Sequence, residues 1–264
     1  MKDIQYKLTC LGLCIVLIGI QSLDAQVKFS FFDNTRSDAG ISYNFFLGND
    51  ADAFSTTING FGSGFIFDIF TGRYSVDFLT FGCEAVNISL GAGLAISKYR
   101  FSENLIFEKT NDEVIAVIDP NPDHDYGTGF FSYGKSKLVY GSVYFPVNLN
   151  ISVKELYFSA GVLLDRYVSG KFKLKYKEND KKQIIVERNN TFNDFFLNKT
   201  KYGINALIMH KPTGLGLGFT YMFTPFFEED KGPSINETRV SLTYDFSGTS
   251  HRKKTEKKPE EIDL

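Results

Sequence analysis

The chain has 264 residues, with 29 Lys and Arg against 31 Asp and Glu and a net charge of −2. Because there is no basic excess, the composition argues against nucleic acid as a partner. The 27 Phe and 14 Tyr are a density typical of β-strands and of membrane interfaces.

The N-terminus has the pattern of a secretory signal peptide. Lys2 and Lys7 give a positive start, residues 8–20 form an apolar stretch, and Ala25 supplies a small residue before a cleavage point. We therefore expect residues 1–25 to be removed and the protein to be exported.

The three cysteines favour neither a disulfide nor a lipid anchor. Cys10 and Cys14 lie in the leader; a lipoprotein interpretation would attach lipid to one of them, but the apolar run continues past both. Cys83 would then be the single thiol of the mature chain, which cannot form an internal disulfide. After the leader no stretch reaches the roughly 18 consecutive apolar residues of a transmembrane helix. A closed barrel can still cross a membrane, because it has no unpaired edge.

The first predicted strands are short. Residues 40–48 and 61–70 alternate apolar and polar side chains with period two, which predicts two strands with one apolar face each. A polar loop at 49–59 separates them. Thr71-Gly72-Arg73 predicts a turn, and residues 74–82 alternate only weakly.

Residues 86–101 alternate more clearly. One face carries Gly, Ser and Asn, which fits the inside of a narrow barrel, where side chains must fill the space without bulk. The other face is apolar and consists of Val86, Ile88, Leu90, Ala92, Leu94 and Ile96.

The strongest pattern is the pair 136–153 and 156–176, predicted as a hairpin of two long strands with one apolar face. Such strands exceed the usual five or six residues, whereas a tilted membrane strand needs about 9–11 residues. Three further strands are predicted at 201–210, 215–227 and 236–246.

The connections differ at the two ends of these strands. Residues 102–134, rich in acid, and residues 177–197 are long, whereas Lys154-Glu155 and residues 211–214 are tight turns. Long loops at one end and short turns at the other are typical of bacterial outer-membrane barrels, with the short turns in the periplasm.

The predicted fold is therefore an all-β, antiparallel, up-and-down transmembrane barrel within residues 26–246. Both termini should be periplasmic, so the strand number must be even. Omitting 27–32 and 74–82 gives eight strands, which we favour, and including both gives ten. Residues 247–264 have no apolar pattern and are predicted to be a disordered charged periplasmic tail.

The chain resembles the Bacteroidota-type outer-membrane β-barrel proteins that are often labelled porin-family. The resemblance rests on SKL…Y…FPVNLNI at 136–151, LYFSAGVLLDRYVSGKFKLKY at 156–176, YRFS at 99–102 and TPFFEEDKGP at 224–233. It implies a barrel and an outer-membrane location, but little about activity, since the family is functionally diverse. The final aromatic, Phe246, resembles the usual assembly signal but is followed by eighteen more residues, so assembly must tolerate the tail.

Some small barrels are lipid-modifying enzymes, which place His and Ser near the outer rim. Of the three histidines, His124 lies in the acidic loop, His210 beside a periplasmic turn and His251 in the tail. Because no predicted strand carries a His to the outer rim, the sequence favours a non-enzymatic protein.

The acidic loop offers one metal candidate. Asp119, Asn121, Asp123 and Asp125 are spaced two apart, as in calcium loops. The turn glycine and the distal Glu of an EF-hand are missing, so a solvated acidic loop is the preferred interpretation. The sequence indicates no cofactor.

Three charged residues are predicted to face the lumen: Asp68, Arg239 and Asp245. One interpretation is a salt-bridge network, because buried charges must be paired. The other is a gated polar path. An eight-stranded barrel is too narrow for an aqueous channel, which favours the network.

The sequence thus predicts a non-enzymatic barrel of the bacterial cell envelope, with a structural or binding role through its extracellular loops. Two alternatives stay open: an accessory subunit of a secretion or envelope-biogenesis machine, and a rim enzyme that modifies lipid. The expected partners are outer-membrane lipid, the barrel-assembly machinery and, through the tail, a periplasmic protein.

Overall fold

A computed structural model describes residues 27–28, 35–48, 50, 68–81, 86–101, 105–127, 134–188 and 195–247, except for the side chains at 27, 28, 68–71, 81, 100 and 101. The expected signal peptide, Cys83, His251 and the tail after Ser247 lie outside these residues. So does most of the loop predicted at 49–59.

The described chain is built from strands. Their bounds are β1 Val27–Lys28, β2 Thr35–Leu47, β3 Asp68–Phe81, β4 Val86–Phe101, β5 Leu105–Lys109, β6 Val114–Ile118, β7 Lys135–Val153, β8 Leu156–Glu178, β9 Lys181–Arg188, β10 Thr200–His210, β11 Leu215–Met222 and β12 Asn236–Asp245. Among the described residues no helix is long and apolar enough to cross a membrane.

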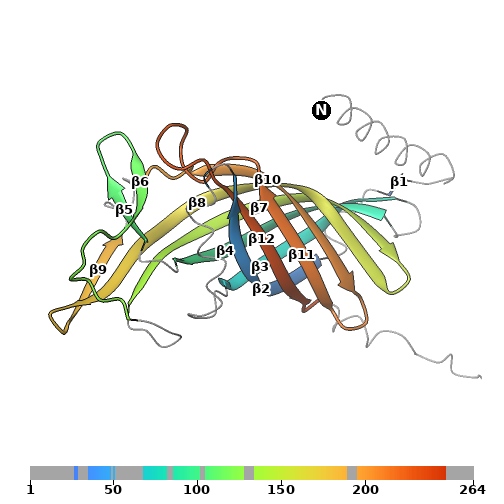
Figure 1. Cartoon of the computed structure of the whole chain (residues 1–264). Coiled ribbons are helices and arrows are strands. Elements are labelled where there is room, and N and C mark those ends of the chain that lie inside the picture. Colours follow the sequence, from blue (N-terminus) through green and yellow to red (C-terminus); the bar gives the residue numbers. More distant parts are fainter. Residues whose placement is uncertain are drawn as a thin grey trace, which may run out of the picture.

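Eight of these strands close into a ring. The pairing order is β3–β2–β12–β11–β10–β8–β7–β4, and β4 pairs again with β3 (Figure 1). Every pairing in the ring is antiparallel. The eight-stranded antiparallel barrel is thereby confirmed.

The outward face of the ring is apolar, as the alternation predicts. Along β8 the side chains from Leu156 to Leu164 cover about 27 Å at ~3.4 Å per residue, which is enough for a tilted strand to cross a bilayer core. We call the exposed outward residues the apolar belt; they include Ile41, Leu90, Leu94, Ile96, Phe145, Val147, Leu149, Ile151, Phe158, Val162, Leu164, Ile204, Ile208, Leu217, Phe219, Val240 and Leu242.

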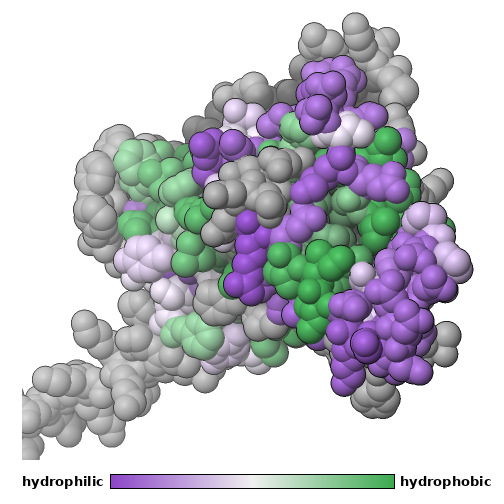
Figure 2. Space-filling model, turned by 90° about the vertical axis from the view of Figure 1, so that its left-hand side faces the viewer, coloured by the Kyte–Doolittle hydropathy of each residue, from purple (hydrophilic) through white to green (hydrophobic). Residues whose placement is uncertain are grey.

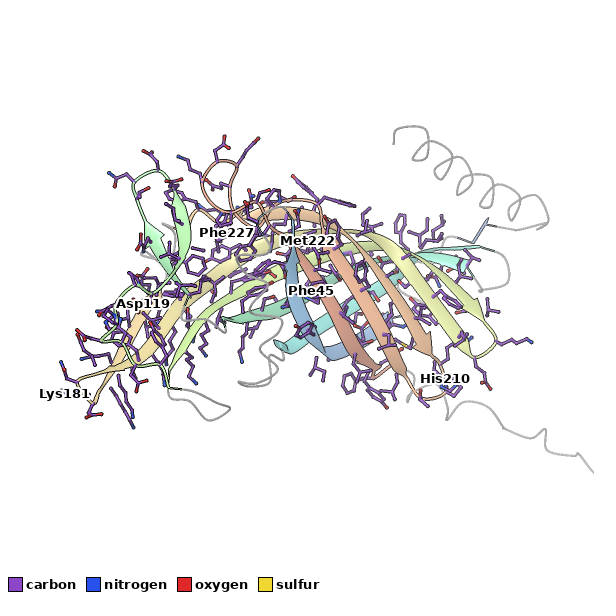
Figure 3. The ribbon with its side chains drawn as sticks, in the orientation of Figure 1. Phe45, Asp119, Lys181, His210, Met222 and Phe227 are labelled. Atoms are coloured by element: carbon purple, nitrogen blue, oxygen red, sulfur yellow. The ribbon has the colours of Figure 1, made fainter. Side chains whose placement is uncertain are left out.

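The two ends of the barrel differ. Short turns join β7 to β8 and β10 to β11, where Lys154 and Gly214 take positive φ of 49° and 72°. The start of β2 and the end of β12 lie at this end, since Asp38 pairs with Asp245. The longer connections and β9 are at the opposite end; Figure 3 shows His210 and Lys181 at the two extremes.

The second strand of the ring differs from the prediction. It is β3, Asp68–Phe81, and it includes both the predicted turn Thr71-Gly72-Arg73 and the weak segment 74–82 up to Phe81. Gly72 pairs with Ala39 on one side and Leu94 on the other, so tertiary pairing overrides the local turn signal. Residues 61–67 lie outside the described residues. Of residues 27–32, which the eight-strand count omits, Val27 and Lys28 pair with the end of β3.

The hairpin β7–β8 continues beyond the ring. A bulge lies where Gly141 and Ser142 pair with Ser169 and Tyr167, so that Val168 is the extra residue. Beyond it β8 pairs with β9 through an Asn179-Asp180 turn in which both φ are positive, the conformation of a two-residue hairpin. The connection predicted at 102–134 contains the separate hairpin β5–β6. We call β9, β5–β6 and the ends of β7 and β8 the projecting sheet (Figure 1).

Candidate functional site

The upper lumen, toward the projecting sheet, contains a buried charge network. Lys201 of β10 donates from Nζ to Glu237 Oε2 at 2.6 Å, and Arg239 donates from Nη2 to Glu237 Oε1 at 2.9 Å. The Tyr140 hydroxyl also donates to Glu237 and accepts from Lys201 at 2.9 Å. We call these four residues and Asp165 the lumen network.

Asp165 completes the charge balance of the lumen network. Its Oδ2 accepts from Ser142 Oγ at 2.9 Å, and the residue is fully buried. The network thus holds two cations, Lys201 and Arg239, and two carboxyl groups, and Glu237 pairs directly with both cations. Since an unpaired buried charge is costly, the direct pairing of Glu237 with both cations stabilises the network.

Two further ion pairs lie nearer the short turns. Arg73 donates to Asp38 Oδ2 from Nη2 at 2.7 Å and from Nε at 2.9 Å. Arg36 Nε lies 3.1 Å from Asp245 Oδ2, and the Arg36 guanidinium stacks 3.5 Å from the Tyr157 ring centroid. These pairs link β2 to β3 and β2 to β12.

The predicted lumen residues therefore fall into different clusters. Arg239 is in the lumen network, with additional bonds to Asn44 and Ser97, whereas Asp245 pairs with Arg36. The side chain of Asp68 lies outside the described ones. Sequence reasoning missed the other members, although the period-two pattern held a signal for two of them: Lys201 and Glu237 occupy inward positions of strands whose outward faces were assigned.

Little open space remains among these charges. A cavity of about 60 Å³ lies between Arg73 and Asp38 on one side and Arg239 and Asp165 on the other. This volume holds only a few water molecules. The lumen is therefore a packed polar interior with one small cavity among the described residues.

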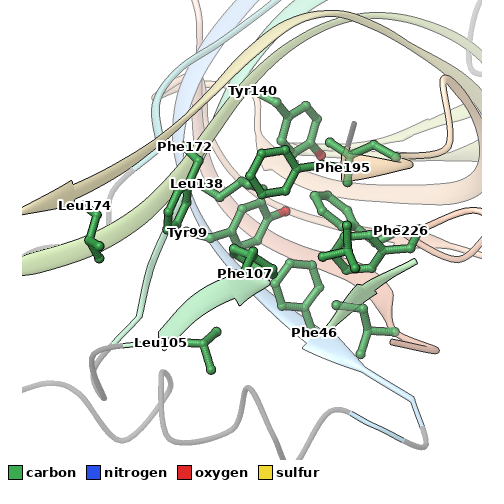
Figure 4. Packing of buried hydrophobic residues seen from close by; sticks show 14 of the residues in the cluster. Phe46, Tyr99, Leu105, Phe107, Leu138, Tyr140, Phe172, Leu174, Phe195 and Phe226 are labelled. Carbon is green, nitrogen blue, oxygen red and sulfur yellow. The ribbon is translucent and has the colours of Figure 1, made fainter. Parts of the chain in front are cut away.

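Toward the projecting sheet, beyond the charges of the lumen network, buried aromatic side chains pack against one another (Figure 4). Tyr99 stacks on Phe46 with ring centroids 4.4 Å apart, and Phe226 meets Tyr140 edge-on at 5.5 Å. We call this cluster the aromatic plug; its buried members include Phe46, Tyr99, Leu105, Phe107, Val114, Leu138, Tyr140, Phe172, Leu174, Phe195, Phe226, Phe227 and Ile235.

The acidic loop folds on itself. Asp119 Oδ2 accepts from the Tyr126 hydroxyl at 2.5 Å and lies 2.6 Å from His124 Nδ1, while Asp119 Oδ1 accepts from the Asn121 amide at 3.0 Å. Burial alone would raise the pKa of Asp119, but these hydrogen bonds outweigh it and hold the pKa below its usual value.

Two of the other candidate calcium ligands, Asn121 and Asp125, also cap backbone amides of the loop. Asn121 Oδ1 accepts from the Asp123 backbone, and Asp125 Oδ1 accepts from the Gly127 backbone at 2.8 Å. Within the described part of the chain no cluster of three His, Cys, Asp or Glu residues is arranged to hold a metal ion. The geometry is that of a self-capped loop.

His124 also belongs to this loop. Its Nε2 lies 2.9 Å from Asn121 Nδ2, and its ring stacks on Tyr176 at 3.7 Å between centroids. Both ring nitrogens are therefore engaged by loop neighbours. His210 lies beside the β10–β11 turn, where its Nδ1 is 3.0 Å from Thr213 Oγ1.

The projecting sheet is tied to the barrel and to itself. Lys109 on β5 pairs with Glu187 on β9 at 2.5 Å. The backbones of Asp125 and Lys177 exchange two hydrogen bonds of 2.8 and 2.7 Å, and the Val114 amide donates to Lys231 at 2.8 Å. Figure 2, which faces this end, shows broad hydrophilic areas beside hydrophobic ones.

No family model and no curated protein matches the chain. Among solved structures, it is similar to the attachment invasion locus protein Ail of Yersinia pestis, determined in complex with the heparin analogue sucrose octasulfate, at 12% identity and a TM-score of 0.35, over 80% of this chain and 97% of Ail. It is also similar to Neisserial surface protein A, at 9% identity and a TM-score of 0.31, over 80% and 95%. Because both TM-scores are below 0.5, the fold assignment rests on the strand pairing itself.

Proposed function

We propose that the protein is a non-enzymatic outer-membrane barrel of the cell envelope that displays a folded binding surface, the projecting sheet, outside the membrane. The barrel is the anchor, with its short turns and both termini in the periplasm. The sequence resemblance to Bacteroidota-type outer-membrane barrels supports the same location.

The observation that carries the proposal is the combination of a filled lumen with an elaborate outer end. A pore-forming role is disfavoured because the lumen network joins β7, β10 and β12 through Tyr140, Lys201 and Glu237, and the aromatic plug packs at the same end of the lumen. By contrast β8 has 23 residues, more than twice what a membrane crossing needs, and β9 and β5–β6 are added to it. Because the projecting sheet is not needed for crossing the membrane, we expect it to be the part of the protein that binds a partner.

The orientation can be tested by cysteine labelling of intact cells. In a Cys83→Ser background, Asp180→Cys at the tip of β8–β9 should react with a membrane-impermeant maleimide. Lys154→Cys at the β7–β8 turn is the matched control, since it also occupies a positive-φ turn, and should react only after the outer membrane is opened. Labelling of Lys154→Cys alone in intact cells would overturn the proposal, as would a protein that shows no heat-modifiable mobility in membrane fractions.

A further inference from the structure

The outward wall of β4, β7, β8 and β9 changes character abruptly above the apolar belt. Along β8 the outward positions are apolar up to Leu164, and after the bulge they become Lys171, Lys173, Lys175 and Lys177. Along β4 the exposed Ile96 is followed on the same face by Lys98.

Cross-strand pairing gathers these lysines into rows. Lys137 pairs with Lys173 and Lys135 with Lys175, while Val139 lies between Lys98 and Lys171. Side chains at directly paired positions share a face and stand close together. We call this surface the lysine face; it comprises Lys98, Lys135, Lys137, Lys171, Lys173, Lys175 and Lys177, with Lys182 and Arg188 on the β9 edge.

The acidic residues of the same strands point the other way. Glu187 pairs with Phe172, whose side chain is buried in the aromatic plug, and binds Lys109 on that side of the sheet. The paired outward positions within β4, β7, β8 and β9 carry no Asp or Glu; an acidic neighbour, Asp125, pairs with Lys177 at the far edge of the lysine face. Burial, and after it the positive charges of Lys135, Lys98, Lys173 and Lys171, lowers the pKa of Lys137 to about 8.

A hollow lies at the boundary between the apolar belt and the lysine face. It measures about 330 Å³ and is lined by Ile96, Val139 and Gly141 on the apolar side and by Lys171 and Arg188 on the charged side. A Cβ added at Gly141 would make ordinary van der Waals contact with Ser169 Oγ at 3.5 Å, so a larger side chain can be introduced at this wall of the hollow without a backbone clash at its Cβ. An apolar trough that ends in two cations matches a molecule with a hydrocarbon chain and an anionic head.

We propose that this hollow binds a phosphorylated membrane lipid, with a hydrocarbon chain along Ile96 and Val139 and the phosphate at Lys171 and Arg188. Continuity with the apolar belt selects a lipid over a soluble anion, because the hollow opens onto the membrane-facing wall. Charge complementarity selects a phosphate, since Lys and Arg are the usual phosphate-binding residues. The other lysines attract the anionic headgroup region around the bound lipid. The inference rests on the proposed function in one respect: the proposed orientation decides which membrane leaflet supplies the lipid.

The test is native mass spectrometry of the full mature chain in a neutral detergent, titrated with dioleoyl phosphatidic acid. Dioleoylglycerol, which has the same chains and no phosphate, is the matched lipid. We expect phosphatidic acid to bind and dioleoylglycerol not to bind at the same concentration. Lys171→Gln/Arg188→Gln should weaken phosphatidic acid binding about 30-fold, from two lost charges near the headgroup.

Two further variants separate the contributions. Lys154→Gln/Lys211→Gln removes the same charge at the short turns and should leave binding unchanged. Gly141→Leu fills the hollow without a change of charge and should also weaken binding. Heat-modifiable mobility of every variant verifies that the barrel is folded.

The proposal is overturned if Lys171→Gln/Arg188→Gln binds phosphatidic acid within twofold of the wild type, or if dioleoylglycerol binds equally well. Displacement by millimolar inorganic phosphate would mean a general anion site and would also overturn it. These outcomes are independent of the labelling experiment: inverted labelling would overturn the proposed function while leaving the binding result in detergent unaffected.

Discussion

Replacement of Glu237 by Gln tests whether the lumen network is a balanced set of charges. Glu237 is 1% exposed, and its carboxylate accepts hydrogen bonds from Lys201 Nζ at 2.6 Å and from Arg239 Nη2 at 2.9 Å. Gln keeps the shape but leaves two buried cations against Asp165 alone. Breaking a buried pair on one side costs about 3–5 kcal/mol, so we expect Glu237→Gln to lower the free energy of unfolding by that amount.

The partner substitution should cost less. In Lys201→Met, Glu237 retains Arg239 and the Tyr140 hydroxyl, so the remaining carboxylate is still paired. The double variant Glu237→Gln/Lys201→Met leaves one buried cation, Arg239, and one carboxyl group, Asp165. Its cost should therefore be smaller than the sum of the single costs by about 0.5–3 kcal/mol.

The assay is reversible urea unfolding in lipid vesicles, followed by the gel mobility of the folded barrel, because the chain has no Trp to serve as a fluorescent probe. Additive single costs would refute the balanced-network reasoning. So would a Glu237→Gln variant as stable as the wild type, since the carboxylate would then not be needed to neutralise the two cations.

Three other outcomes are expected. Leu90→Arg, in the middle of the apolar belt, should cost about 2–4 kcal/mol and Val153→Arg beside the short turn about 0–1, measured by the same unfolding; equal costs would place the membrane elsewhere. The purified protein in planar bilayers should give no steady porin-like conductance, because the lumen network and the aromatic plug fill the path; stable channels would contradict the closed lumen. The pKa of Lys137 is about 8, so its acetylation rate, followed by mass spectrometry, should rise through that pH. Lys173→Gln should move the midpoint of this rise to higher pH, and a wild-type midpoint near pH 10 would argue against a crowded lysine face.

The faces of the barrel strands could be predicted because they depend on period two alone. Ser42, Ser89 and Asn150 are buried in the lumen where the alternation places them, and Leu94 and Val162 are exposed on the belt. The second strand could not be located in the same way. Gly72 reads locally as part of a turn, and what makes it a strand residue is its pairing with β2 and β4, which no local pattern contains.

The partners within the lumen were equally out of reach. Parity shows that Arg239 and Asp245 point inward, but which charge they meet depends on how the whole ring closes. Tyr140 and Glu237, which share a hydrogen bond, are 97 residues apart in the chain. Arg36 of the first ring strand pairs with Asp245 of the last because β2 and β12 are neighbours only after closure.

The bulge at Val168 connects the two halves of the molecule. Before it, odd positions of β8 such as Asp165 face the lumen; after it, even positions such as Phe172 face inward and odd positions such as Lys171 face outward. Without this one extra residue the strand would carry its lysines into the aromatic plug and its aromatic residues onto the outer wall. In the membrane-spanning part the outer wall is apolar, and the charged side chains face inward, where they find partners. In the part that has water outside, the charged lysines face outward and the aromatic side chains pack inside. The bulge therefore lies at the height where the solvent outside the wall changes, between the apolar belt and the lysine face.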